Sequence, residues 1–129
     1  MKFTKRQIER YSRQIILKKI GVIGQKKLLK SSVLIVGAGG LGSPIAIYLT
    51  ALGVGKIGII DKDNIEISNL SRQIIFSTND LKKNKSSVAI NKLRKINPDI
   101  KLHSFNKRLT KKNINQVAKN FDLIVDGSD

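Results

Sequence analysis

The chain of 129 residues is 40% hydrophobic and 26% charged, which is typical of one globular domain. It has no cysteine, which excludes a disulfide framework and a cysteine nucleophile within these residues, and no apolar stretch near the roughly 20 residues that span a bilayer, so we expect a cytoplasmic protein without a membrane partner. The net charge of +16 comes from lysines scattered along the chain without interleaved aromatic residues, which favours a solvated basic surface over a nucleic-acid interface.

The N-terminal residues predict helices. Thr4 and Gln7 have the spacing of a capping box, and apolar residues recur on one face of the helix that follows. Gly21 and Gly24 are expected to break this helix, and a second short helical piece is predicted at residues 25–29. We expect these helices to form a separate N-terminal segment.

Residues 31–129, which follow the helical segment of residues 1–30, alternate between apolar strands and helices. Strands are predicted at residues 33–36, 56–60, 101–105 and 121–125, and helices at residues 43–52, 86–96 and 110–120. Strands joined through helices form right-handed crossovers in a parallel sheet. We therefore predict a doubly wound, Rossmann-like α/β domain with strand order 3-2-1-4, truncated after its fourth strand.

The stretch VLIVGAGGLG carries the spacing G-x-G-x-x-G at Gly37, Gly39 and Gly42, between a predicted strand and a predicted helix. Glycines at these positions let backbone N–H groups approach a phosphate at the start of the helix. Asp61, at the end of the second strand, can accept hydrogen bonds from ribose hydroxyls. These features predict a nucleotide site, but they fit NAD as well as ATP.

The stretch SNLSRQ at residues 68–73 favours ATP over NAD. Arg72 can form bidentate bonds to phosphate oxygens, and Lys85 at the start of the next helix can add a positive charge. Asp126 and Asp129, after the fourth strand, provide carboxylates that can hold Mg²⁺ together with substrate phosphates. The alternatives are an NAD(P)-dependent oxidoreductase, which only the glycines and Asp61 support, and a basic nucleic-acid-binding fragment, which the scattering of the lysines disfavours.

Several stretches together resemble the ThiF/MoeB/HesA family, the bacterial relatives of ubiquitin-activating enzymes. They are, in order, RYSRQIIL, VLIVGAGGLGSP, IIDKD, SNLSRQ and LIVDGSD. The resemblance covers the chain from about Tyr11 to Asp129. It implies ATP-dependent adenylation of the C-terminal carboxylate of a ubiquitin-like sulfur-carrier protein of the ThiS or MoaD type. Pyrophosphate is released, and the product serves thiamine or molybdopterin biosynthesis.

The resemblance also assigns the nucleotide-binding residues. The positions that match the family's motifs are Gly37, Gly39, Gly40, Gly42, Asp61, Asn69, Arg72 and Lys85. By this resemblance Gly39 and Gly40 lie against the nucleotide and Asp61 holds the ribose. Asn69, Arg72 and Lys85 are implied to bind phosphates.

The remaining implied roles extend beyond one subunit. Asp129 is implied as the essential acid that positions Mg²⁺, and Arg13 as the arginine that one protomer of a homodimer contributes to the other's site. The family's zinc-binding cysteine pairs and its sulfur-transfer cysteine lie beyond Asp129. We therefore expect the chain as given to be a nucleotide-binding half that is inactive alone.

Overall fold

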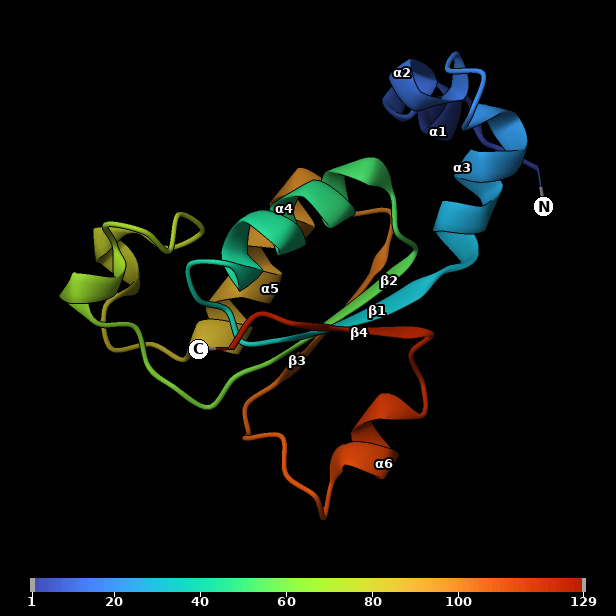
Figure 1. The fold of residues 1–129 in the computed structure, drawn as a ribbon. Coiled ribbons are helices and arrows are strands. Elements are labelled where there is room, and N and C mark those ends of the chain that lie inside the picture. The colour runs from blue at the N-terminus through green and yellow to red at the C-terminus, as the bar shows by residue number, and fades with distance from the viewer. Residues whose placement is uncertain (1, 129) are drawn as a thin grey trace.

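A computed structural model describes residues 2–128 and shows a four-stranded parallel sheet between helical layers (Figure 1). The strands are β1 (Ser32–Val36), β2 (Lys56–Ile60), β3 (Lys101–Phe105) and β4 (Leu123–Asp126), in the order β3-β2-β1-β4. The helices of the sheet domain are α4 (Gly42–Leu52), α5 (Lys85–Ile96) and α6 (Ile114–Ala118). The predicted Rossmann-like α/β class, parallel pairing and strand order are confirmed.

The alternation of side chains along the central strands makes two cores. Ile35 and Ile59 lie on the face that α4 and α5 cover, where they join Leu93. Leu34 lies on the opposite face, where it packs with Val117 of α6. All of these side chains are at most 4% exposed. Because both faces of these strands are covered, the strands are continuously apolar.

Three helices precede the sheet: α1 (Lys5–Arg10), α2 (Ser12–Ile15) and α3 (Gly21–Lys30). The capping box of Thr4 and Gln7 is confirmed. The expectation that Gly21 and Gly24 break the helix is wrong. The chain turns before Gly21, which is the first residue of α3 and has a φ of 59°. Gly24 lies inside α3.

The last predicted helix is shorter than expected. Residues 110–113 form a turn in which the Asn113 side chain accepts a hydrogen bond from the Thr110 backbone (2.8 Å) and donates to the Arg108 carbonyl (2.8 Å). Side-chain bonds of this kind compete with helical hydrogen bonds. Helix α6 therefore begins only at Ile114.

Residues 61–84 connect β2 to α5 through an irregular segment with two 3₁₀ turns, Ile67–Asn69 and Thr78–Asp80. The first of these turns coincides with the helical turn that the sequence predicts near Ser68. Within residues 2–128, no helix combines the length and apolar character needed to cross a membrane.

Asp80 holds the end of this irregular segment onto α5. Its carboxylate is buried and accepts hydrogen bonds from the Ser77 backbone (2.8 Å), the Ser77 hydroxyl (3.0 Å) and Lys92 Nζ. Burial raises the pKa of Asp80, but the bonds from Ser77 and Lys92 outweigh it and lower the pKa below its ordinary value. The carboxylate is therefore charged in the folded protein at neutral pH.

We expect Asp80→Asn to lower the free energy of unfolding by about 1.5–3 kcal/mol at pH 7, the range for hydrogen bonds to a charged group. Because the folded pKa is depressed, this contribution is present above the unfolded value of about 3.9 and is lost as the pH falls below it. Urea denaturation at pH 7 and pH 3 measures the difference, which shrinks at the lower pH. Glu66→Gln, at an exposed pair with Lys82, is the control and changes stability by less than about 1 kcal/mol.

Candidate functional site

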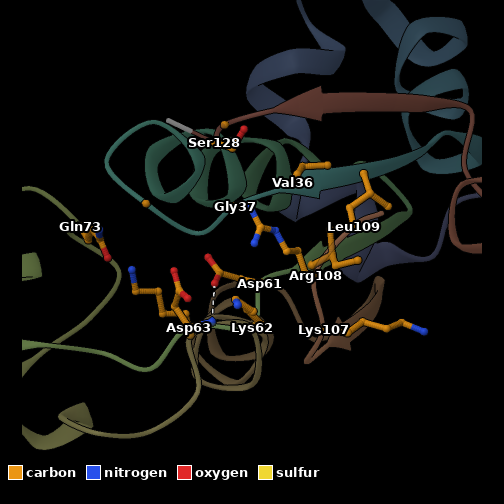
Figure 2. A pocket seen from close by; sticks show the side chains of 14 residues that line it. Val36, Gly37, Asp61, Lys62, Asp63, Gln73, Lys107, Arg108, Leu109 and Ser128 are labelled. Carbon is orange, nitrogen blue, oxygen red and sulfur yellow. Dashed lines mark hydrogen bonds between the residues drawn. The ribbon is translucent and has the colours of Figure 1, made fainter. Parts of the chain in front are cut away.

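A cavity of about 560 Å³ opens at the carboxyl ends of the strands (Figure 2). Its wall combines the last residues of β1 and β2, residues directly after each of the four strands, and two further residues, Gln73 and Lys85. They are Val36, Gly37, Gly39, Ile60, Asp61, Lys62, Asp63, Gln73, Lys85, Lys107, Arg108, Leu109, Gly127 and Ser128. This is the edge at which open α/β sheets bind ligands, where the strand order reverses between β1 and β4.

The glycines of the loop after β1 have two different tasks. Gly37 has a φ of 90°, and a Cβ on Gly42 would overlap the Gly37 carbonyl oxygen, so these two glycines allow backbone to pack on backbone. A Cβ on Gly39 or Gly40 would meet no atom closer than 3.6 Å. These two positions therefore leave space that a ligand can occupy.

Asp61 is fixed at the cavity wall through both carboxylate oxygens. Oδ2 accepts a hydrogen bond from the Ala38 backbone (2.9 Å), and Oδ1 accepts one from the Asp63 backbone (2.8 Å). A carboxylate oxygen can accept two hydrogen bonds, so each oxygen of Asp61 can still accept one from a hydroxyl group. The orientation suits a ribose-binding acid next to the glycine loop.

Lys85 is the first residue of α5 and is only 7% exposed, yet its side chain lines the cavity. Among residues 2–128 no carboxylate lies within ion-pair distance of its ammonium group. Its ammonium is therefore a positive charge at the cavity that an anionic ligand can pair with. Of Lys82, Lys83 and Lys85, only Lys85 lines this cavity. Lys82 pairs with Glu66 instead (3.0 Å).

Two residues of the SNLSRQ stretch lie beside the cavity and not in its wall. The Arg72 side chain passes Gly40, where a Cβ would lie 3.6 Å from Cγ, and its Nη1 donates to the Ser68 carbonyl (3.0 Å). Asn69 uses its side-chain oxygen to accept a hydrogen bond from the Glu66 backbone (2.8 Å). Arg72 is thus next to the open part of the loop, whereas the Asn69 oxygen closes a turn.

The structure does not bring Arg13 to this cavity. It lies on α2, which Figure 1 places with α1 and α3 away from the carboxyl ends of the strands. Its motif neighbours are bound within the chain: Arg10 to Asp99 (3.4 Å), the buried Tyr11 hydroxyl to Asn97 (2.9 Å), and Gln14 to the carbonyl of residue 52 (3.1 Å). Arg13 is the exposed arginine of the motif.

Asp129 lies outside the described residues. Asp126, at the end of β4, accepts hydrogen bonds from the Ser128 hydroxyl and backbone, and these bonds lower the pKa of its carboxyl group. Among residues 2–128, no group of three or more His, Cys, Asp or Glu side chains could hold a metal ion. Asp126 therefore adds a charged carboxylate near the site, but within the described part of the chain it is not part of a group of side chains that could hold a metal ion by itself.

Sequence reasoning missed the part of the wall that follows β3. Figure 2 shows the Arg108 guanidinium directed toward the space near Gly37 and Asp61, whereas Lys107 points away, with its ammonium 5.9 Å from the centre of the Phe105 ring. Leu109 adds an apolar surface to the same wall. The signal was their position directly after a predicted strand, because such positions face the ligand in this fold.

The sequence is similar to known proteins over almost the whole chain. A model of the ThiF family matches residues 11–129. The sulfur carrier protein adenylyltransferase of Thermus thermophilus is 43% identical over 129 residues, which are 100% of this chain and 48% of that protein. The sulfur carrier protein ThiS adenylyltransferase of Escherichia coli is 45% identical over 124 residues, 96% of this chain and 49% of that protein.

The fold also has a close structural counterpart. The tRNA N6-threonylcarbamoyladenosine dehydratase of E. coli superposes with a TM-score of 0.92 at 24% identity, over 100% of this chain and 53% of that one. The chain thus spans about half the length of the relatives that it matches. The family match, the motifs and the architecture all agree, and the chain belongs to the ThiF family.

Proposed function

We propose that the chain is the nucleotide-binding part of an enzyme that uses ATP to adenylate the C-terminal carboxylate of a ubiquitin-like sulfur-carrier protein. The observation that carries the proposal is Lys85, a residue only 7% exposed, which lines the same cavity as Asp61 and the open glycines and whose ammonium has no anionic partner among residues 2–128. A triphosphate supplies the missing negative charge. The names of the relatives, which are sulfur-carrier adenylyltransferases, support this substrate class.

Different parts of the cavity wall suit the phosphates, the ribose and the base of a nucleotide. Lys85 and the loop at Gly39 and Gly40 suit the phosphates, because backbone N–H groups at the start of α4 and a cation attract anions. Asp61 suits the ribose, and the apolar surface that Leu109 shares with Val36 and Ile60 suits the base. This division assigns the wall after β3 to the adenine.

The chemistry that follows is acyl adenylation. A carboxylate oxygen of the carrier protein attacks the α-phosphorus, the bond to the bridging oxygen breaks, and pyrophosphate leaves with the electron pair. Arg72 and Lys85 neutralise the negative charge that develops on the leaving pyrophosphate, since fixed cations contribute most where charge accumulates. The product is an acyl adenylate, which a sulfur nucleophile can attack.

We propose that Mg²⁺ accompanies the nucleotide, where it neutralises phosphate charge. Asp129 is the residue proposed to hold it. The charged Asp126 carboxylate and the Gln73 side-chain oxygen, which is buried without a hydrogen-bond donor among residues 2–128, are acceptors for the waters that this ion keeps. The residues present therefore fit a magnesium–nucleotide complex.

We further propose that two copies of the chain form a homodimer in which Arg13 completes the partner's site. Besides the exposed Arg13, the N-terminal helices and their connection expose an unusual number of large apolar side chains. These are Ile8, Ile16, Leu17, Val22 and Ile23, with exposed fractions of 46–73%. Apolar surface of this kind marks contacts between proteins.

Nucleotide preference tests the proposal directly. With the full-length enzyme, of which this chain is proposed to be the nucleotide-binding part, we expect calorimetry to show binding of ATP with Mg²⁺ and no comparable binding of NAD; the exchange assays below use the same full-length enzyme. Labelled pyrophosphate is expected to exchange into ATP only when a ThiS- or MoaD-type carrier protein is present. Preference for NAD would overturn the proposal in favour of an oxidoreductase, and the carrier that supports exchange would assign thiamine or molybdopterin biosynthesis.

Arg72→Ala is expected to lower the rate of ATP–pyrophosphate exchange on the order of 100-fold, the usual cost of removing one group that stabilises transition-state charge. Stability should change little, because the Arg72 side chain is exposed. Arg94→Ala, at an exposed arginine of α5, is the matched control and should leave exchange unaltered. Normal exchange in Arg72→Ala would contradict the assignment.

A further inference from the structure

Gln73 is a buried polar residue of the cavity wall that lacks a partner. It is 5% exposed, and within residues 2–128 its side-chain oxygen Oε1 is buried without a hydrogen-bond donor. Its backbone is fixed, since its N–H donates to the Asn69 carbonyl (2.8 Å) and its carbonyl accepts from Phe76 (3.1 Å). A buried acceptor left unpaired costs free energy and calls for a missing ligand or water.

The other end of this carboxamide locates it within the site. A Cβ on Gly39 would lie 3.7 Å from Gln73 Nε2, so the side chain borders the open part of the glycine loop. Lys85 lines the same cavity. The carboxamide is therefore at the end of the cavity to which the phosphates are assigned.

Phosphate oxygens cannot satisfy Gln73 Oε1, because both groups are acceptors and repel each other. The missing donor must arrive with the ligand in another form. Mg²⁺ bound to nucleotide phosphates usually keeps several of its waters, and each of these is a strong hydrogen-bond donor. A hydrated cation on the triphosphate therefore converts an unfavourable contact into a favourable one.

We infer that Gln73 accepts a hydrogen bond from the hydration shell of the magnesium–nucleotide complex and so distinguishes Mg·ATP from metal-free ATP. The inference rests on the proposed function, in that the cavity must take ATP. It makes Gln73 a positioning residue for the metal-bound form of the nucleotide.

Gln73→Met in the full chain tests the inference, since methionine keeps the length of the side chain and removes the acceptor. By calorimetry we expect the dissociation constant for ATP with Mg²⁺ to rise on the order of ten-fold, and that for ATP in EDTA to stay unchanged. The melting temperature of the unliganded protein should not fall, because an unpaired buried acceptor has been removed.

Gln73→Glu gives the opposite pattern, since it retains an oxygen acceptor and adds a negative charge. Binding of ATP with Mg²⁺ should be retained, whereas binding of ATP in EDTA should weaken. Gln116→Met, at an exposed glutamine of α6, is the matched control and should leave both affinities unchanged.

The outcomes separate the inference from the proposed function. If the wild-type chain binds no ATP under either condition, the proposed function itself is overturned. If the wild-type chain binds Mg·ATP but Gln73→Met loses affinity equally with and without metal, or loses none, only the role of Gln73 is overturned.

Discussion

Replacement of Gly42 by alanine is expected to destabilise the fold by about 3 kcal/mol or more. The added methyl group would overlap the Gly37 carbonyl oxygen, and Gly37 is held in place because its backbone N–H donates to the Ile60 carbonyl (3.0 Å). The turn after β4 cannot yield either, because a Cβ on Gly127 would lie 3.0 Å from the Gly42 backbone. Neighbouring backbone segments must therefore separate to admit one methyl group.

Urea denaturation monitored by circular dichroism measures this effect, and Gly40→Ala provides the control. A Cβ on Gly40 would meet its nearest atom, Arg72 Cγ, at 3.6 Å, an ordinary van der Waals distance. Gly40→Ala should therefore retain stability while narrowing the space open to a nucleotide. Equal stability of the two variants would show that the contact between Gly37 and Gly42 is not rigid.

Gly37 and Gly42 also show why local sequence patterns predicted this fold well. Their spacing between an apolar run and a helix predicts the β1–loop–α4 unit, and the β-branched residues of β2 predict the neighbouring strand. These signals depend on steric and burial requirements that hold wherever the unit occurs. The prediction that Gly21 ends a helix was wrong, because Gly21 begins α3 with a positive φ. The residues beside it in the sequence do not determine whether a glycine ends or begins a helix.

Two residues that the sequence predicted for the site lie at the ends of elements, Asp61 directly after β2 and Lys85 at the start of α5. Asp61 and Lys85 were predicted as ligand-binding residues, and both lie in the cavity wall. Arg108 was missed because the loop after β3 carries no motif, and only the assembled sheet brings it to the cavity. The position of the Asn69 side chain was also unpredictable, since it depends on a turn closed by the Glu66 backbone.

Mixing two inactive variants is expected to restore activity if the site is shared between subunits. Arg13→Ala removes the residue proposed to act in the partner, and Lys85→Met removes the ammonium within the subunit while keeping the buried side chain apolar. Each homodimer then lacks a complete site, and exchange should fall on the order of 100-fold in either variant alone. The choice of Lys85 follows from its place in the cavity wall.

In a mixed dimer one site combines Lys85 of one subunit with Arg13 of the other and is complete. Random co-assembly makes about half of the dimers mixed, with one complete site each, so activity should recover to about a quarter of wild type. Mixing Lys85→Met with Arg72→Ala is the control, because both residues belong to the same subunit's site and no complete site can form. Recovery in the first mixture alone would establish the shared site, whereas no recovery from demonstrably mixed dimers would exclude Arg13 from the partner's chemistry.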